Sequence, residues 1–410
     1  MEIIQEILAQ PNGLYYLLIP VFSGLIGLAT NFIGIQMMFK PTEFVGLKPV
    51  MGWQGIIPAR AKKFAALQMD QVEKIIDVQD VLEKIDIDGV NKLIQPNLQQ
   101  LIEQVMADAE SRATKVYWEK VPSFLKKRLY RKIENELPDT VRRLMDDIKE
   151  NHQSLLDIKQ MVINRFDEDK GLLVRLIKKT IDTELGFLVK SGLVLGFIFG
   201  IIQMIVFFKY PGTWYVLPVG GFVVGYITNW IAIKLMFWPL DPIKIGPFVL
   251  QGVFIKRKDQ VAKDYSETLT ESVLNAETFA NYILRSESSS PLNKLLKFYI
   301  NDAIDRSLGG SKHLVLYSMG AENYIKFKSS FYENLSSENL PLSVQAGIAY
   351  TEQEINLSEI IESRMKEFTP SELDGFVRPI FEEDEWLLYV VGGSLGFLAG
   401  WGQLVLMFSS

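Results

Sequence analysis

A Thr-Asn pair occurs twice inside long apolar stretches of this sequence. Thr30 and Asn31 follow a run of glycine and aliphatic residues, and Thr228 and Asn229 follow a similar run farther along the chain. Polar side chains inside membrane-length segments either hydrogen-bond neighbouring helices or line a polar site for an ion or solute. Both interpretations are open for these pairs, and the first is favoured. No Asp, Glu, Arg or His lies deep in either run, which argues against a proton relay or a voltage sensor.

Two glutamines complete rows of glycines in two other apolar stretches. Gln203 lies eleven residues after Gly192, and Gln403 lies eleven residues after Gly392. Eleven residues are about three helical turns, so each amide falls on the same helix face as its glycines. Rows of small residues let helix backbones approach closely in lipid. Gln203 and Gln403 are therefore predicted to point at a partner helix.

Two arginines follow the first and third apolar stretches, and each comes shortly after a Gln-Gly pair. Arg60 and Arg257 would lie at the boundary between the membrane and the cytosol. The favoured interpretation is contact with phosphate headgroups of lipids. A specific ligand is the alternative, with no further residue to support it.

Motifs of known catalytic machinery are absent from the sequence. It contains no cysteine, no Walker loop, no GxGxxG, no GxSxG and no HExxH, and its two histidines, His152 and His313, stand apart from ligand clusters. The sequence therefore predicts no catalytic residues, no metal site, no cofactor and no enzyme activity.

The polar residues are carried by four apolar segments long enough to cross a membrane. We predict an all-α, polytopic membrane protein with helical, polar domains between its spans. An alternative for residues 20–41 is a re-entrant or broken helix, because Thr-Asn between glycines can interrupt one. The predicted parts are a first span at 1–40, helical domain A at 41–186, a transmembrane hairpin with a short outside turn at 187–238, helical domain B at 239–385 and a fourth span at 386–410.

The two halves of the chain resemble each other. Residues 20–65 align with 218–262, and the second and fourth spans align at a constant offset of 200 residues. Each half has an even number of spans, so the halves are predicted to enter the membrane in the same direction, as parallel tandem repeats.

Charge asymmetry predicts the orientation. Lysines and arginines cluster after the first and third spans and before the second, whereas the other side offers only Lys209. By the positive-inside rule, both large domains are cytoplasmic. The acidic run 382–385 opposes this locally, but acidic residues contribute little to the rule.

The segment from Arg112 to Lys132 is strongly basic, with Glu119 as its one acidic residue. Interleaved apolar residues suggest an amphipathic helix that lies on anionic lipid. A solvated face of a helical bundle explains the pattern equally well. No recognition motif for nucleic acid accompanies the charge, so nucleic acid is not a predicted partner.

The repeated signature Gly-x-x-Thr-Asn-x-Ile-x-Ile-x-x-Met-Phe-x-Pro, the following Gln-Gly-x-x-x-x-Arg and the Leu-Gly-Phe-x-x-Gly-x-x-Gln spans resemble the YheB/YjiN group of bacterial membrane proteins. That group is the domain-of-unknown-function family numbered 445. The resemblance covers essentially the whole chain. It implies a multi-pass protein of the bacterial cytoplasmic membrane and implies no activity.

Three functions fit these features. The first is a non-enzymatic membrane protein that scaffolds, or contacts lipids or partners, at the inner leaflet. The second is a transporter or channel with a polar site at the repeat interface, and the third is lipid handling by the helical domains. The predicted partners are membrane lipids, with protein partners at the inner leaflet and a homo-oligomer left open.

Overall fold

The computed structural model describes residues 5–7, 9, 13–47, 51–94, 122–210, 213–285, 290–335 and 342–408. The chain divides into two compact units. Unit 1 comprises residues 1–71, 163–268 and 361–410, and unit 2 comprises residues 72–162 and 269–360. Each unit therefore takes segments from both halves of the sequence.

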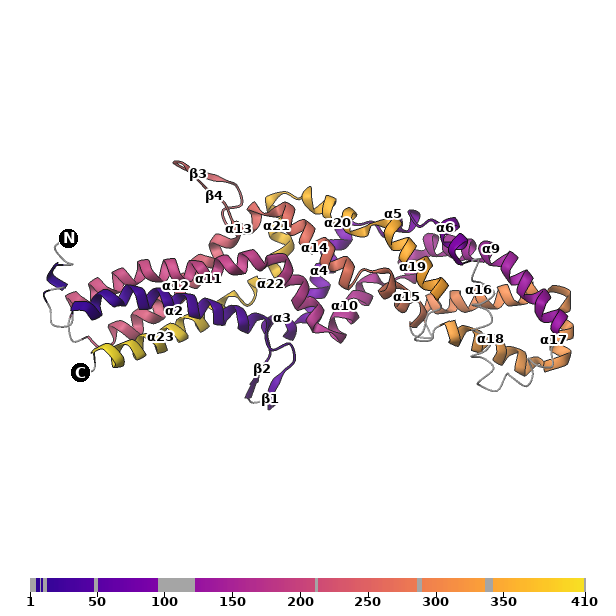
Figure 1. The fold of residues 1–410 in the computed structure, drawn as a ribbon, viewed down its shortest axis with the longest axis horizontal. Helices are drawn as coiled ribbons and strands as arrows, with labels where there is room; N and C mark the ends of the chain where they lie inside the picture. Colours follow the sequence, from indigo (N-terminus) through magenta and orange to yellow (C-terminus); the bar gives the residue numbers. More distant parts are fainter. Residues whose placement is uncertain are drawn as a thin grey trace. The chain divides into compact units, whose positions relative to one another are not determined.

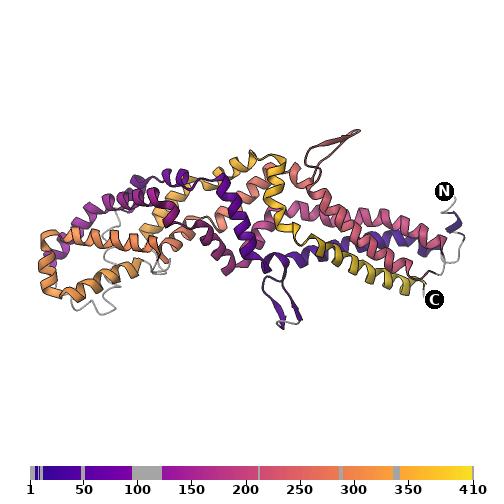
Figure 2. The same ribbon diagram turned by 180° about the vertical axis from the view of Figure 1, so that it is seen from behind.

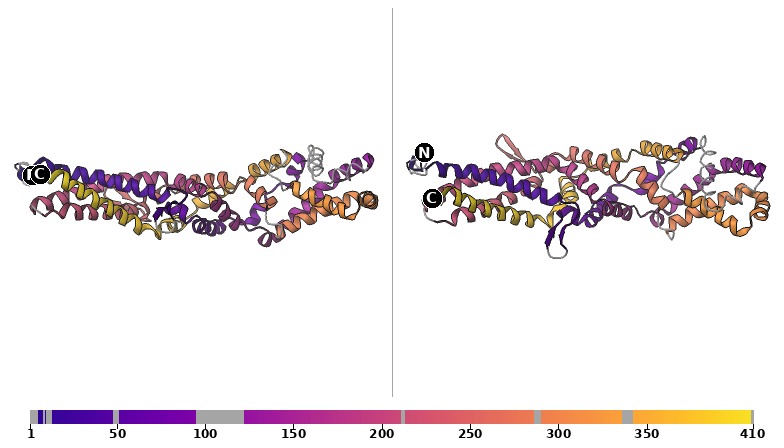
Figure 3. Two further views of the ribbon diagram at one scale, coloured as in Figure 1. Left: turned by 90° about the horizontal axis from the view of Figure 1, so that it is seen from below. Right: turned by 60° about the horizontal axis from the view of Figure 1, so that its bottom comes forward.

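Four long apolar helices form the bundle of unit 1 (Figure 1). They are α2 (Gly13–Phe39), α11 (Lys170–Lys209), α12 (Val216–Phe237) and α23 (Glu385–Phe408). Helix α2 packs along α11, and α12 packs along α23, with further contacts between the two pairs. Figure 3 shows these four helices side by side in two further views. All four are long enough to cross a membrane, as predicted.

The first span is one unbroken helix. Helical structure runs from Gly13 to Phe39 through the Thr30-Asn31 pair, and the Thr30 hydroxyl donates a hydrogen bond back to the carbonyl of Gly27 at 3.1 Å. A hydroxyl bonded in this way stays within the helical turn and does not interrupt it. The alternative of a broken helix at residues 20–41 is therefore wrong, and the alternative of a re-entrant segment stays a prediction.

Two small β-hairpins follow the first and third spans. Strands β1 (Val45–Leu47) and β2 (Met51–Trp53) pair antiparallel, as do β3 (Ile243–Ile245) and β4 (Phe248–Leu250). The sequence analysis did not predict them, because three-residue strands are too short for an alternating pattern to stand out.

Short helices complete unit 1 next to the bundle. In whole or in part they are α3 (Ile56–Ala59), α4 (Ala61–Ile75), α10 (Ile158–Glu168), α13 (Val253–Lys256), α14 (Lys258–Ser272), α20 (Leu357–Lys366), α21 (Pro370–Val377) and α22 (Pro379–Glu382). Large side chains from both halves are fully buried here, among them Phe64, Phe166, Phe254 and Phe376.

The described elements of unit 2 are all helices and turns of helix. Besides ends of the helices named above, it contains α5 (Val78–Glu83), α6 (Ile87–Ile94), α9 (Ser123–Leu155), α15 (Ala276–Arg285), α16 (Pro291–Leu308), the 3₁₀ turn η3 (Gly309–Ser311), α17 (Lys312–Met319), α18 (Ala321–Leu335) and α19 (Leu342–Ile355). One core joins the halves: Leu82 and Ile148 pack with Leu292 and Leu296. Domains A and B of the sequence analysis thus both contribute to one compact unit.

Candidate functional site

The two asparagines of the repeated Thr-Asn pairs bind the backbone of a neighbouring helix. Asn31 on α2 donates its side-chain N–H to the carbonyl oxygen of Leu188 on α11, at 2.6 Å. Asn229 on α12 donates to Leu388 on α23 at 2.8 Å. Both residues are buried, with 1% and 3% of their surfaces exposed. Leu188 and Leu388 are separated by the same offset of 200 residues as the aligned spans, so the two contacts are equivalent.

The other polar atoms of these pairs differ in how they are satisfied. Each threonine bonds within its own helix: Thr30 to Gly27 and Thr228 to Gly225. The side-chain oxygens of Asn31 and Asn229 are buried and have no hydrogen-bond partner within the described residues. The side-chain N–H groups of the asparagines therefore join helices, whereas their side-chain oxygens accept no hydrogen bond from the described residues.

The two glutamines lie on the buried side of their helices but make different contacts. Gln203 on α11 accepts from the Ser23 hydroxyl on α2 at 3.2 Å and donates to the carbonyl of Leu217 on α12 at 3.1 Å. One amide thus joins three helices. Gln403 on α23 is equally buried, and its side-chain nitrogen has no hydrogen-bond partner in the part of the chain that the structure describes.

Glycines bring the helices close enough for these hydrogen bonds. A side chain at Gly192 would collide with the backbone carbonyl of Gly27 and would lie 2.7 Å from the Asn31 nitrogen. Gly392 stands in the same relation to Gly225 and Asn229. Both helix pairs therefore need glycine at their crossing. The missing side chains leave room for each asparagine to reach the neighbouring helix.

The two arginines form ion pairs that cross between the halves of the sequence. Arg257 pairs with Glu184 at 2.8 Å, and the Glu184 side chain is fully buried. Arg60 pairs with Asp384 at 3.1 Å and with Glu383 at 2.9 Å. The first-half arginine thus binds a second-half carboxylate, and the second-half arginine binds a first-half carboxylate. Contact of Arg60 and Arg257 with lipid headgroups stays a prediction.

Sequence reasoning missed the carboxylates of these pairs. Glu184 and Asp384 are 200 residues apart, the offset at which the second and fourth spans align. An acidic residue in both copies, close to the start of an apolar stretch, was the signal that could have identified them. In each carboxylate one oxygen is buried and lacks a hydrogen-bond partner among the described residues.

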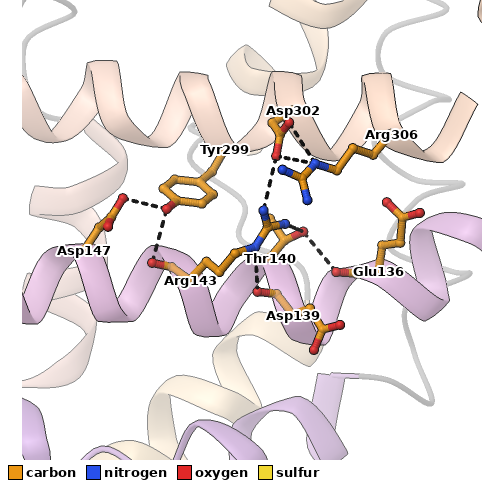
Figure 4. Close-up of polar contacts among 8 residues, drawn as sticks. All are labelled: Glu136, Asp139, Thr140, Arg143, Asp147, Tyr299, Asp302 and Arg306. Carbon is orange, nitrogen blue, oxygen red and sulfur yellow. Dashed lines mark hydrogen bonds and ion pairs between the residues drawn. The ribbon is translucent and has the colours of Figure 1, made fainter. Parts of the chain in front are cut away.

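A second polar cluster joins α9 and α16 in unit 2 (Figure 4). The Tyr299 hydroxyl donates to the Asp147 carboxylate at 2.5 Å, and burial, together with this bond, raises the pKa of Tyr299 to about 12. Asp302 pairs with Arg306 at 2.9 Å and with Arg143 at 3.7 Å. Each of these side chains has a protein partner, an arrangement that fixes two helices together and does not expose a reactive group.

Part of the predicted basic segment lies outside the described residues. Residues 112–121 are not described, whereas Lys127 and Arg128 are exposed on α9. The interpretations of this segment, as a lipid-binding helix or a solvated face, both stay predictions.

The chain is similar to bacterial proteins named UPF0754 membrane protein. It is 27% identical to one from Rippkaea orientalis over 146 residues, which is 34% of this chain and 33% of the relative. It is 38% identical to one from Microcystis aeruginosa over 69 residues, or 16% of each chain. It is 24% identical to one from Bacillus mycoides over 204 residues, or 43% of this chain and 52% of the relative. The chain thus spans a third or less of the first two relatives.

No family model matches the sequence, and no solved structure matches it. The relatives' names and the four apolar helices agree on a bacterial membrane protein with transmembrane helices. These names do not carry the YheB/YjiN label, which stays a prediction.

Proposed function

We propose that this chain is a non-enzymatic scaffold of the bacterial cytoplasmic membrane, built from two parallel tandem repeats with its polar helical segments on the cytoplasmic side. One observation carries the proposal: three buried amide side chains inside the bundle join neighbouring helices. Asn31, Asn229 and Gln203 each donate to a backbone carbonyl of another helix. Such a bundle anchors in the membrane the helical segments that contact lipids or partners at the inner leaflet.

Equivalent contacts in the two halves support the tandem repeat. The bond from Asn31 to Leu188 has its counterpart in the bond from Asn229 to Leu388. Parallel repeats place both polar segments on one side of the membrane, and the excess of lysine and arginine there points to the cytoplasm.

A transporter or channel is the second candidate. The oxygens of Asn31 and Asn229, buried and without a hydrogen-bond partner among the described residues, favour it, because an ion or solute could use such acceptors. Close packing of both amides against glycine counts against it, since transport needs a polar cavity at this place. Lipid handling by the helical domains is a third candidate.

Topology is tested with single cysteines, which the natural sequence lacks. Tyr317→Cys places the thiol on α17, where the tyrosine is 93% exposed, and Tyr210→Cys places it after α11, where the tyrosine is 58% exposed. In intact cells, an impermeant maleimide should label position 210 and spare position 317 until the cells are opened. Labelling of both positions in intact cells would overturn the proposed orientation.

Substitution of the two asparagines distinguishes the scaffold hypothesis from the transporter hypothesis. Proteoliposomes that hold the double variant Asn31→Leu, Asn229→Leu should show the same ion and solute leakage as the natural chain if the amides only join helices. A change in permeability that is confined to the double variant, with Ile33→Leu on the exposed face of α2 as the control, would favour the transporter.

A further inference from the structure

The two β-hairpins occupy equivalent places. β1 begins six residues after α2 ends, and β3 begins six residues after α12 ends. In Figures 1 and 2 both hairpins project sideways from unit 1, where these two helices end. The function proposed above gives them no role.

The base of each hairpin is closed by matching hydrogen bonds. The Gly55 amide donates to Pro41, and the Gly252 amide donates to Pro239, both at 2.9 Å. The glutamine before each glycine adds a second bond. Gln54 donates to Thr42 at 2.7 Å, and Gln251 donates to Leu240 at 3.0 Å. The repeated Gln-Gly pair of the sequence is therefore the clamp that closes the hairpin.

The clamp also fixes the hairpin to the end of the preceding helix. A side chain at Gly55 would lie 2.8 Å from the backbone nitrogen of Lys40. A side chain at Gly252 would lie 2.6 Å from the carbonyl carbon of Phe237. The returning strand thus packs directly on the helix end, which only glycine allows, and the hairpin has a set direction.

Beyond this base, the hairpins expose apolar side chains. Val45 and Leu47 are 64% and 79% exposed on β1, and Ile243 and Val249 are 42% and 55% exposed on β3 and β4. A two-stranded ribbon alone is marginally stable in water, and exposed β-branched and aliphatic residues add to its cost. Because both hairpins share these exposed apolar side chains, we expect an apolar environment around both of them.

Aromatic residues indicate where the lipid ends. Exposed Trp214 and Tyr215 lie before α12, and exposed Trp238 follows it. Tyr215 and Trp238 are 23 residues apart, and that number of helical residues spans about 34 Å, close to the thickness of the hydrocarbon core. Tryptophan and tyrosine collect at both interfaces of a membrane. Trp238 thus marks one interface, directly at the base of the second hairpin.

We propose that both hairpins lie in this membrane interface, with Val45, Leu47, Ile243 and Val249 inserted among the lipid headgroups and upper acyl chains. The occupant of the apolar surface is lipid because the hairpins continue sideways from spans whose own exposed side chains are apolar, such as Phe32 and Ile33 on α2. Exposed Lys40 and Lys244 then lie at the level of the phosphates. The proposal requires only that α2 and α12 cross the membrane, so it stands apart from the scaffold function.

Fluorescent labels at single cysteines test the insertion. Leu47→Cys and Val249→Cys, each carrying an environment-sensitive NBD group, are placed in vesicles of phosphatidylcholine and phosphatidylglycerol. Leu25→Cys on the lipid-exposed face of α2 is the positive control, and Tyr317→Cys is the aqueous control. Both hairpin labels should fluoresce at shorter wavelength than the label at 317, and brominated phosphatidylcholine should quench them at least twofold.

Three outcomes overturn the proposal. Hairpin labels that are quenched by aqueous iodide as strongly as the label at 317 would place the hairpins in water. Labels protected from iodide but unaffected by brominated lipid would place them against protein. Quenching by brominated lipid at only one of the two hairpins would contradict the proposal that both hairpins are inserted. Failure of the topology experiment would leave these readouts unchanged, because the brominated lipid is present in both leaflets.

Discussion

At the scale of single residues, the bundle depends on two equivalent amides. Asn31→Ala and Asn229→Ala each remove a hydrogen bond between helices, at 2.6 and 2.8 Å in the natural chain. Each should lower the free energy of unfolding by about 0.6 to 2 kcal/mol. Unfolding in mixed micelles by titration with SDS measures the change. The double variant should be additive, because the bonds join different helix pairs, and Ile33→Ala on the exposed face of α2 is the control.

The crossed ion pairs should differ in strength. Arg257→Ala leaves the fully buried Glu184 carboxylate without its cation, and such a loss costs about 3 to 5 kcal/mol. Arg60→Ala removes a side chain that is 42% exposed and leaves Glu383 paired with Lys63, but it takes the cation from Asp384, whose side chain is 12% exposed. Its cost should therefore be smaller than that of Arg257→Ala, at about 1 to 3 kcal/mol. The same SDS titration compares them. Equal losses in the two variants would contradict this account of burial.

One carboxylate in unit 2 makes stability depend on pH. Burial alone would raise the pKa of Asp305, but hydrogen bonds from Tyr324 and Lys312 and the charge of Lys328 outweigh it, so the pKa lies below its ordinary value of 3.8. The stabilisation is therefore present above pH 3.8 and is lost as the pH falls through the lowered pKa.

Asp305→Asn tests this pH dependence. At pH 7 it should destabilise the packing of α16 with α18 by about 1.5 kcal/mol, because hydrogen bonds to a charged group are lost. Hydrogen exchange at the amides of α16 and α18 reports the change, and the difference from the natural chain should shrink towards pH 3. A difference that persists unchanged at low pH would exclude Asp305 as its source.

At the scale of elements, one helix contains both a required and a dispensable glycine. Gly192→Ala on α11 puts a methyl group against the backbone of Gly27 and should destabilise the bundle by about 1 to 3 kcal/mol. Gly186→Ala, on the same helix, meets no atom of the described residues within 4 Å and should stabilise the helix by up to about 1 kcal/mol through helix propensity. SDS titration of both variants measures the contrast. Equal effects would refute close packing of α2 and α11.

The sequence predicted these elements unevenly. The four spans follow from apolar length, and α12 ends at Phe237, one residue before the predicted end of the transmembrane hairpin at 238. The start of α11 at Lys170 was missed, because charged residues alternate with apolar ones in its first turns, which therefore give no membrane signal. The hairpins were missed because their strands are short, although the Gln-Gly pair that clamps them was noticed as a repeat.

The candidate site was predicted as a set of residue types but not as a set of contacts. The glycine rows and the helical period were sufficient to predict that Gln203 points toward other helices. The partners are backbone carbonyls, as with Leu188, and a sequence pattern does not mark which carbonyl a side chain reaches. The pairing of Arg257 with Glu184 depends on tertiary structure, since the two residues are 73 positions apart.

At the scale of the whole molecule, the halves of the chain are interdependent. In unit 1 the ion pairs of Arg60 and Arg257 each join one half to the other. In unit 2 the core places Ile148 from the first half against Leu292 from the second. Neither half contains both sides of these contacts, so a half-chain exposes charged and apolar surface that the intact chain buries.

A chain cut between residues 211 and 212, between α11 and α12, tests this interdependence. When the two fragments are expressed together, we expect them to copurify from the membrane in a one-to-one ratio, because buried pairs and a shared apolar core hold them. Arg257→Glu in the second fragment should reduce recovery several-fold by placing a second negative charge beside Glu184, whereas Tyr317→Ala, at an exposed position, should not. Sedimentation of either fragment alone as a stable, protease-resistant monomer would show that each half folds independently, contrary to the shared core.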